Sequence, residues 1–404
     1  MSTLAVLHIG TKKTGTTFLQ TLLMNNQQVL ADAGWTYPDF LDFRNHLKIV
    51  LPFAANKDTE IHRAEGLTTE AANTELVAEY NKRFTELVKP GGKWIFSSEF
   101  FASRLRSEAE VGACVSFLKQ HFDNVKVVVY YRRPEFMVPS TYSQSVKEGL
   151  SRDLDMRYVE RHLNDFAHLE LLTRWRNVVG AENVTARPYL ERYRNDSDAM
   201  VADFCAAVGI EPRTPWVEPI EDRSNHSLGT DGLQVLRTIN FYFPKPGATY
   251  KRPMVRQRAA VARRVQATTA GGKVGLTEAM TAALLARFAD RNRELANAVT
   301  GAGWDEWLEQ PAPPPVGPMA ITMMNGEIAA ALIQLVDPKE KITAAFVTQV
   351  IARLAKPIGV VDWNDPTCAP ASAATSALLA KPGQLVTAPP CTDRQQRNCP
   401  RDSA

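Results

Sequence analysis

The fold is decided by the stretch LAVLHIGTKKTGTTFLQ, residues 4–20. Residues 4–9 are apolar and uncharged, which is typical of a strand buried in a parallel sheet, and Gly10 ends this run. In residues 16–26 the apolar side chains recur at the spacing of one buried helical face. The sequence therefore predicts a strand, a short loop and a helix at the start of the chain.

The loop between them, residues 11–17, has the composition of an anion-binding loop. It contains two lysines, four threonines and one glycine. Backbone N–H groups at a helix N-terminus have no intrahelical partner and lie at the positive end of the helix dipole, so they bind phosphate or sulfate. Thr16 and Thr17 add hydroxyl donors, and Lys13 adds a positive charge.

The position of the lysine distinguishes this loop from that of nucleoside triphosphatases, which has the pattern G-x-x-x-x-G-K-[ST]. Gly10 and Gly15 have the spacing of that pattern, but Thr16 stands where the lysine is required. The sequence K-T-G-T-T after a first strand resembles instead the 5′-phosphosulfate loop of sulfotransferases that use 3′-phosphoadenosine 5′-phosphosulfate (PAPS). The resemblance implies PAPS as co-substrate, no metal, and a binding loop formed by Lys13, Thr14, Gly15, Thr16 and Thr17.

A second motif follows the β-branched run at residues 125–131. The segment RRPEFMVPSTYSQSVKEG resembles the sulfotransferase 3′-phosphate motif, in which an arginine closes a strand and a serine eight residues later lies on the next helix. Arg132 and Ser140 have that spacing, and the resemblance implies that they bind the 3′-phosphate.

Two features leave alternatives for this second motif. Pro139 lies inside the predicted helix and would kink it, in which case Thr141 could serve in place of Ser140. Arg132 and Arg133 could also be a pair of surface salt-bridge partners.

The segment KWIFSSEFF, residues 93–101, predicts a strand with Glu99 near its carboxyl end. Ligands bind at that edge of open α/β sheets. The family resemblance implies that Glu99 is the general base, with Lys13 as the second catalytic residue. The alternative is a first-turn glutamate that only interacts favourably with the helix dipole.

The rest of the chain completes the predicted architecture. Helices are expected at residues 70–88, 108–121, 165–179, 200–208 and 277–298, and a further strand at 183–189. With the resemblance, the expected fold is a three-layer P-loop-like α/β fold, with a central parallel sheet flanked by helices and a small helical C-terminal extension. The expected divisions are a sulfotransferase catalytic domain (1–310), a Pro-rich linker (311–318), a short helical extension (319–364) and a disordered tail (365–404).

Three polar segments are candidates for contact with ligands. The sulfotransferase resemblance implies that Arg44, His46 and Lys48 could meet the acceptor, although a solvated surface loop also explains them. The segment around Arg223 could close over the cofactor or be a plain loop, and the basic residues of 250–264 could form a patch or a solvated helix face.

Composition narrows the class of protein. The formal net charge of +3 over 404 residues is too small to indicate nucleic acid as a partner. Five cysteines without a C-x-x-C pair indicate a reducing compartment and no structural zinc. With no apolar stretch of membrane-spanning length and no leader before the first strand, we expect a cytoplasmic protein.

The sequence therefore predicts a sulfotransferase that transfers a sulfuryl group from PAPS to a hydroxyl or amine. The acceptor, which could be a carbohydrate, a lipid or another small molecule, is not identified by the sequence, and neither is the oligomeric state. Two alternatives stay open: a catalytically silent sulfotransferase-like binding or scaffold protein and, less favoured, a P-loop kinase.

Overall fold

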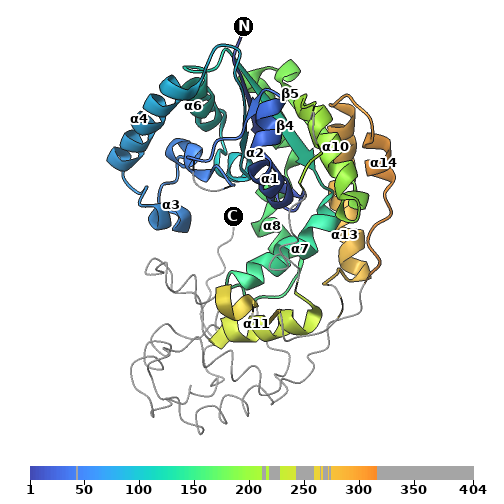
Figure 1. Cartoon of the computed structure of the whole chain (residues 1–404). Helices are drawn as coiled ribbons and strands as arrows, with labels where there is room; N and C mark the ends of the chain where they lie inside the picture. The colour runs from blue at the N-terminus through green and yellow to red at the C-terminus, as the bar shows by residue number, and fades with distance from the viewer. Residues whose placement is uncertain are drawn as a thin grey trace, which may run out of the picture.

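The computed structural model describes residues 1–41, 44–211, 215–217, 228–242, 259–263, 265–266, 272 and 274–315 (Figure 1). The expected helical extension and tail, the end of the linker and the Arg223 loop lie outside these residues, as does most of the basic segment.

The centre of the molecule is a parallel sheet of five strands in the order β2-β3-β1-β4-β5. The strands are β1 (Leu4–His8), β2 (Trp35–Thr36), β3 (Lys93–Ser97), β4 (Asn124–Tyr131) and β5 (Val184–Pro188). Because all five run in the same direction, the ends of β1, β3 and β4 meet at one edge; His8, the last residue of β1, pairs with Ser97 of β3 and Val128 of β4.

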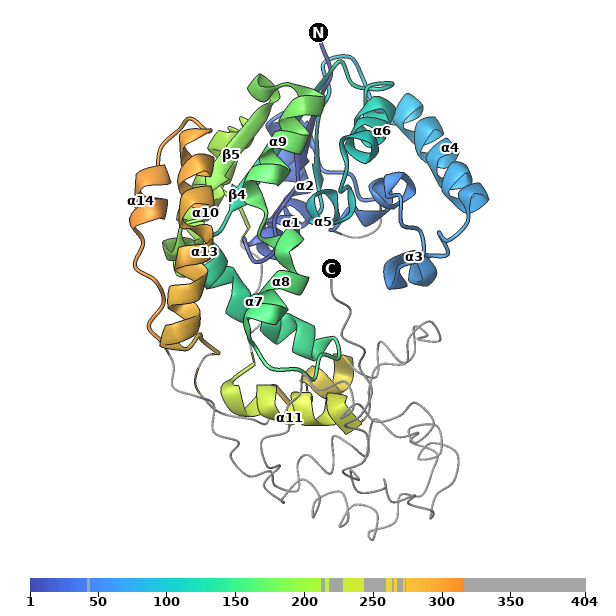
Figure 2. The same cartoon turned by 180° about the vertical axis from the view of Figure 1, so that it is seen from behind.

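Helices cover both faces of this sheet. The chain leaves β1 through α1 (Thr16–Asn25) toward β2, but leaves β3 through α6 (Glu108–Leu118) in the opposite direction, toward β4. Right-handed crossovers therefore place α1 and α6 on opposite faces. The helix α9 (His168–Val179) packs against α6, whereas α10 (Ser197–Val208) lies on the α1 face, where Phe204 contacts His8. Figure 1 shows α1 and α2 in front of the sheet, and Figure 2, the view from behind, shows α9 in front of the opposite face. The predicted α/β fold with a central parallel sheet flanked by helices is confirmed.

The remaining elements are shorter or lie around this centre. The α-helices are α2 (Gln27–Asp32), α3 (Glu60–Glu65), α4 (Glu70–Leu87), α5 (Phe100–Arg104), α7 (Pro134–Lys147), α8 (Met156–Arg161), α11 (Thr230–Tyr242), α13 (Glu278–Asn297) and α14 (Trp304–Glu309). The 3-10 turns are η1 (Leu47–Ile49), η2 (Leu51–Phe53), η3 (Leu163–Asp165), η4 (Ala181–Asn183) and η5 (Glu191–Arg194). All five predicted long helices are present, and their ends differ from the predicted ends by three residues at most.

Local sequence explains several of these boundaries. Thr69 caps α4 by accepting a hydrogen bond from the amide of Ala72, and Ser107 and Glu110 form a complete capping box at α6. Leu87 of α4 is an exposed apolar side chain, at 47%. It lies in the last turn of the helix, where the chain leaves the core.

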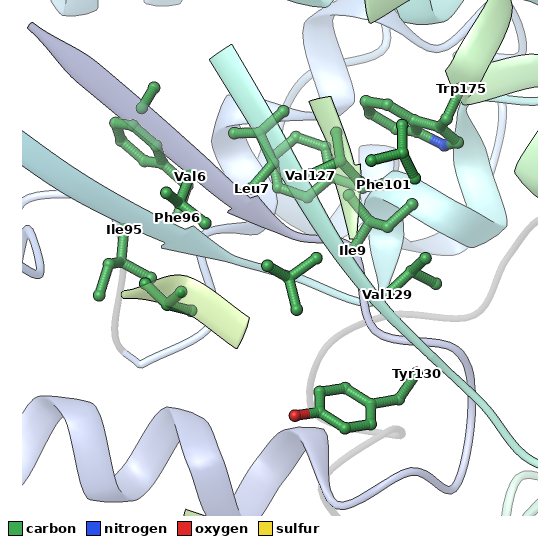
Figure 3. Packing of buried hydrophobic residues seen from close by; sticks show 14 of the residues in the cluster. Val6, Leu7, Ile9, Ile95, Phe96, Phe101, Val127, Val129, Tyr130 and Trp175 are labelled. Atoms are coloured by element: carbon green, nitrogen blue, oxygen red, sulfur yellow. The ribbon is translucent and has the colours of Figure 1, made fainter. Parts of the chain in front are cut away.

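The core lies between the sheet and its helices (Figure 3). Val6, Ile95 and Val127 of the three central strands are at most 1% exposed, and Phe101 and Trp175 pack edge to face. Strands buried on both faces are expected to be apolar, as residues 4–7 of β1 and 127–131 of β4 are. A second cluster beyond the sheet joins α7, α11 and α13, so α7 is held at both ends.

In the described part of the chain, no helix is long and apolar enough to cross a membrane, and no three His, Cys, Asp or Glu residues form a group that could hold a metal ion. Cys114 and Cys205 are buried free thiols; the other three cysteines lie outside the described residues.

Candidate functional site

The loop between β1 and α1 is tightly folded. Lys13 has a φ of 65° and is the only non-glycine residue with positive φ in the described chain, while Gly15 has a φ of 74°. A β-carbon at Gly10 would lie 2.2 Å from Oγ1 of Thr16, so the strand end and the helix start are in close contact. A left-handed lysine costs about 1 kcal/mol, and such strain is concentrated at functional sites.

Two threonines of the loop hold its shape through backbone carbonyls. Thr11 Oγ1 donates to the carbonyl of Tyr130 at 2.7 Å, and Thr14 Oγ1 donates to the carbonyl of Thr11 at 2.7 Å. The hydroxyl of Thr14 is therefore used inside the loop, which sequence reasoning did not anticipate. Thr16 is buried and Thr17 is exposed.

The N-terminus of α1 keeps the features of an anion site. No side chain of the described residues caps it, and its first turn contains no acidic residue. The first N–H groups of a helix have no intrahelical acceptor and carry the positive end of the helix dipole. These donors are therefore available to an anionic group.

The two lysines of the loop have different environments. Lys12 forms an ion pair with Asp165 at 2.8 Å. Within the described residues, Lys13 Nζ has neither a hydrogen-bond partner nor an ion-pair partner. Burial lowers the pKa of Lys13, and the opposing charges of Glu148 and Glu99 raise it in part. Of the two loop lysines, Lys13 is therefore the one without an ion-pair partner in the described part of the chain.

Arg132, at the end of β4, contacts the loop directly. Its Nη1 donates to the carbonyl of Lys13 at 3.1 Å, so it holds the strained peptide in place. Its Nε and Nη2 donate to the two carboxylate oxygens of Glu191 at 2.5 and 2.6 Å, and its guanidinium lies 5.4 Å from the ring centroid of Tyr189. Arg132 is only 4% exposed. Neither Glu191 nor Tyr189 was indicated by the motif.

Arg133 has a separate, structural role. It pairs with Glu135, and its Nη1 donates to the carbonyls of Trp307, Leu308 and Gln310 at 2.7 to 3.0 Å. It thereby caps the C-terminal end of α14. Since Arg133 is 6% exposed and Arg132 is equally buried, the alternative that the two are surface ion pairs is wrong.

The helix α7 begins at Pro134, where proline is well suited, and continues through Pro139 without a break. Ser140 is half-buried. Thr141 is 3% exposed, and its Oγ1 has no hydrogen-bond partner among the described residues. Neither hydroxyl is bonded to Arg132, so both stay candidates for the 3′-phosphate.

Glu99 follows β3 on the other side of β1 and is half-buried. Its two carboxylate oxygens each accept from Nδ2 of Asn45 at 3.0 Å, and Oε2 accepts from Gln20 at 3.4 Å. Ser98 Oγ donates to Oδ1 of Asn45 at 2.7 Å, which turns the amide nitrogen toward Glu99. The carboxylate is thus oriented by amides, and no lysine or arginine of the described residues forms an ion pair with it.

His46 positions this arrangement and is not part of a solvated loop. Its Nδ1 accepts from the amide of Ser97 at 3.1 Å, so its Nε2 carries the proton and donates to the carbonyl of Pro38 at 2.9 Å. The ring is fully buried, and burial lowers its pKa to about 3. It holds the neighbouring Asn45 against β3. This pairing connects distant segments, and no local signal in the sequence indicates it.

A further cation lies near the loop. Lys147, at the end of α7, donates to Gln266 at 2.9 Å. Burial and the charge of Lys13 lower its pKa to about 8. The carboxyl edge of the sheet therefore assembles the loop of β1, Arg132 after β4 and Glu99 after β3, with Lys147 nearby.

Comparison with known proteins gives distant structural likeness only. No protein-family model and no curated protein matches the sequence. A sulfotransferase from Alicyclobacillus acidocaldarius is 14% identical with a TM-score of 0.34, and the match covers 62% of this chain and 98% of that one. A sulfotransferase domain from the curacin biosynthetic pathway is 12% identical with a TM-score of 0.30, covering 54% of this chain and 75% of that one. A sulfotransferase domain from the Synechococcus PCC 7002 olefin synthase is 14% identical with a TM-score of 0.25, and the match covers 71% of this chain and 94% of that one. At such low TM-scores the likeness does not decide a function, and the residues of the site must.

Proposed function

We propose that this protein is a sulfotransferase that transfers a sulfuryl group from PAPS to a hydroxyl or amine of an acceptor. The observation that carries the proposal is the contact between Arg132 and the carbonyl of Lys13. It joins the end of β4 to a loop in which Lys13 has no ion-pair partner among the described residues and in which no described side chain caps the following helix. Two anion-binding elements thus adjoin at one edge of the sheet, as a donor with two separate anionic groups requires.

The residues at this edge of the sheet suit the two anionic groups of PAPS, the 5′-phosphosulfate and the 3′-phosphate. The 5′-phosphosulfate binds the N-terminus of α1, with Lys13 and the hydroxyls of Thr16 and Thr17 as further donors. The 3′-phosphate binds Arg132, with Ser140 or Thr141. Three N–H groups of Arg132 are used within the protein, and a guanidinium has five, so two remain for the phosphate.

The transfer step balances with the groups at this edge. The acceptor oxygen or nitrogen attacks sulfur, the bond from sulfur to the bridging phosphate oxygen breaks, and the acceptor proton passes to Glu99. Lys13 stabilises the negative charge that develops on the bridging oxygen, and adenosine 3′,5′-bisphosphate leaves. Asn45 and Gln20 keep the Glu99 carboxylate oriented for the proton.

Binding of the product nucleotide tests the donor. We expect adenosine 3′,5′-bisphosphate to bind more tightly than ADP in a calorimeter without magnesium. Because a charge-assisted hydrogen bond contributes about 1.5–3 kcal/mol, Arg132→Ala should weaken that binding at least tenfold. Arg132→Lys keeps the charge but loses the planar fork, so it should also weaken binding. Arg192→Ala is the control, since Arg192 is 56% exposed and pairs with Glu306.

Other outcomes favour other functions. Equal or tighter binding of ADP would favour a P-loop kinase, although Thr16 stands where the lysine of that motif is needed. Binding of neither nucleotide would leave a silent scaffold as the better description.

Turnover then tests Glu99 as the base. In a screen of carbohydrate, lipid and other small-molecule acceptors with labelled PAPS, Glu99→Gln should lower kcat by about 10²- to 10⁴-fold. Its affinity for adenosine 3′,5′-bisphosphate should stay at the wild-type value. Unchanged turnover in this variant would remove Glu99 from the mechanism, and nucleotide binding without turnover on any acceptor would favour a silent binding protein.

A further inference from the structure

The guanidinium of Arg132 already holds an anion of the protein itself. Glu191, the first residue of η5, receives two parallel hydrogen bonds from it, at 2.5 Å from Nε and 2.6 Å from Nη2. This is the geometry by which an arginine binds a carboxylate or a phosphate with two donors. Glu191 therefore occupies one complete binding edge of the residue proposed for the 3′-phosphate.

Burial explains why the free protein needs this carboxylate. Arg132 is 4% exposed, and a buried charge without a counter-ion is strongly unfavourable. Among the described residues, the other hydrogen bond of its guanidinium goes to the neutral carbonyl of Lys13. Glu191 thus supplies the negative charge that a bound phosphate would otherwise provide.

A second cation is available to Glu191 outside the site. Arg194, three residues along in η5, lies 3.6 Å from Oε2 of Glu191 and its side chain is 46% exposed. The Glu191 side chain itself is 23% exposed. The carboxylate therefore lies between a buried arginine and an exposed one, and it can leave the first without losing all ion pairing.

We propose that Glu191 is a built-in competitor for the 3′-phosphate and a specificity-determining residue of the nucleotide site. A phosphate dianion on Arg132 repels the Glu191 carboxylate, which moves toward Arg194. A nucleotide without a 3′-phosphate leaves the Arg132–Glu191 pair intact. Glu191 consequently weakens the hold on adenosine 3′,5′-bisphosphate and speeds its release, and this inference rests on the proposed function.

The test compares adenosine 3′,5′-bisphosphate with AMP, which lacks only the 3′-phosphate. In Glu191→Gln, affinity for the bisphosphate should rise roughly tenfold, the loss of one charge-assisted competitor, with a matching fall in its dissociation rate. Affinity for AMP should not change. The matched control is Glu306→Gln, which removes the carboxylate that pairs with Arg192 of the same η5 but does not touch Arg132; it should alter neither affinity.

A second variant keeps the inference testable if Glu191→Gln does not fold. Arg194→Gln removes the exposed partner, so Glu191 should stay on Arg132 and affinity for the bisphosphate should fall while that for AMP is unchanged. A lower bisphosphate affinity in Glu191→Gln, or equal changes for both nucleotides, would overturn the inference, because Glu191 would then be orienting Arg132. If the wild-type protein does not prefer the bisphosphate to AMP, the proposed function itself fails.

Discussion

Replacing Gly10 by alanine is expected to destabilise the protein, although alanine is compatible with the backbone there. Gly10 is not among the residues with positive φ. The added β-carbon would instead lie 2.2 Å from Oγ1 and 2.9 Å from Cγ2 of Thr16, below the distances at which real β-carbons contact other atoms. Because the 7% exposed Thr16 starts α1, the clash must push the helix away from β1.

The loss of stability can be set by the general cost of overpacking a buried site. Overpacking of a close-packed site costs about 1–3 kcal/mol, and we expect Gly10→Ala to fall in that range. Thr16→Ala removes both close atoms and leaves only its β-carbon at 3.2 Å. The double variant should therefore recover most of the loss, with a coupling free energy of at least about 0.5 kcal/mol.

Urea unfolding followed by circular dichroism measures these differences as shifts of the midpoint at constant m-value. Gly112→Ala is the matched control, since it lies within α6 and an added β-carbon there meets nothing within 4 Å. That variant should be more stable than the wild type by about 0.5–1 kcal/mol. The reasoning is refuted if Gly10→Ala is as stable as the wild type, or if Thr16→Ala gives no relief.

Two further predictions concern buried charge. Asp203 accepts a hydrogen bond from the hydroxyl of Tyr130 at 2.7 Å and forms an ion pair with Arg187. Asp203→Asn should therefore lower the free energy of unfolding in urea by on the order of 3 kcal/mol. Glu306→Gln, which breaks an exposed ion pair, should lower it by less than about 1 kcal/mol. Equal costs would contradict this difference. Burial lowers the pKa of five histidines in the described chain, and it does so most for His46, to about 3, and for His8 and His168, to about 4. Below pH 6.5 the unfolded chain binds protons at these histidines that the folded protein does not bind. The free energy of unfolding should therefore fall from pH 6.5 toward pH 4, by up to about 1.4 kcal/mol per pH unit for each histidine whose pKa is lowered that far. His46→Gln should reduce this slope in urea unfolding measured at several pH values.

The α/β architecture and the loop between β1 and α1 could be predicted from the amino-acid sequence alone. Both follow from local information, because the apolar run of β1, Gly10 and Gly15, the lysines of the loop and the helical spacing of α1 are contiguous in the sequence. The buried parts of the central strands are apolar because helices cover both faces of the sheet. Arg132 and Glu99 were likewise indicated because each follows a recognisable strand.

Only the tertiary structure decided how these residues are held. The partners of Arg132 and Glu99 come from elsewhere in the chain: Glu191 lies 59 positions from Arg132, and Asn45 lies 54 positions from Glu99. Likewise, Arg133 looks like Arg132 in the sequence but caps α14 over 170 residues away. Hydrogen bonds of this kind depend on which side chains the folded sheet brings within 3 Å, and no local pattern of residues specifies that.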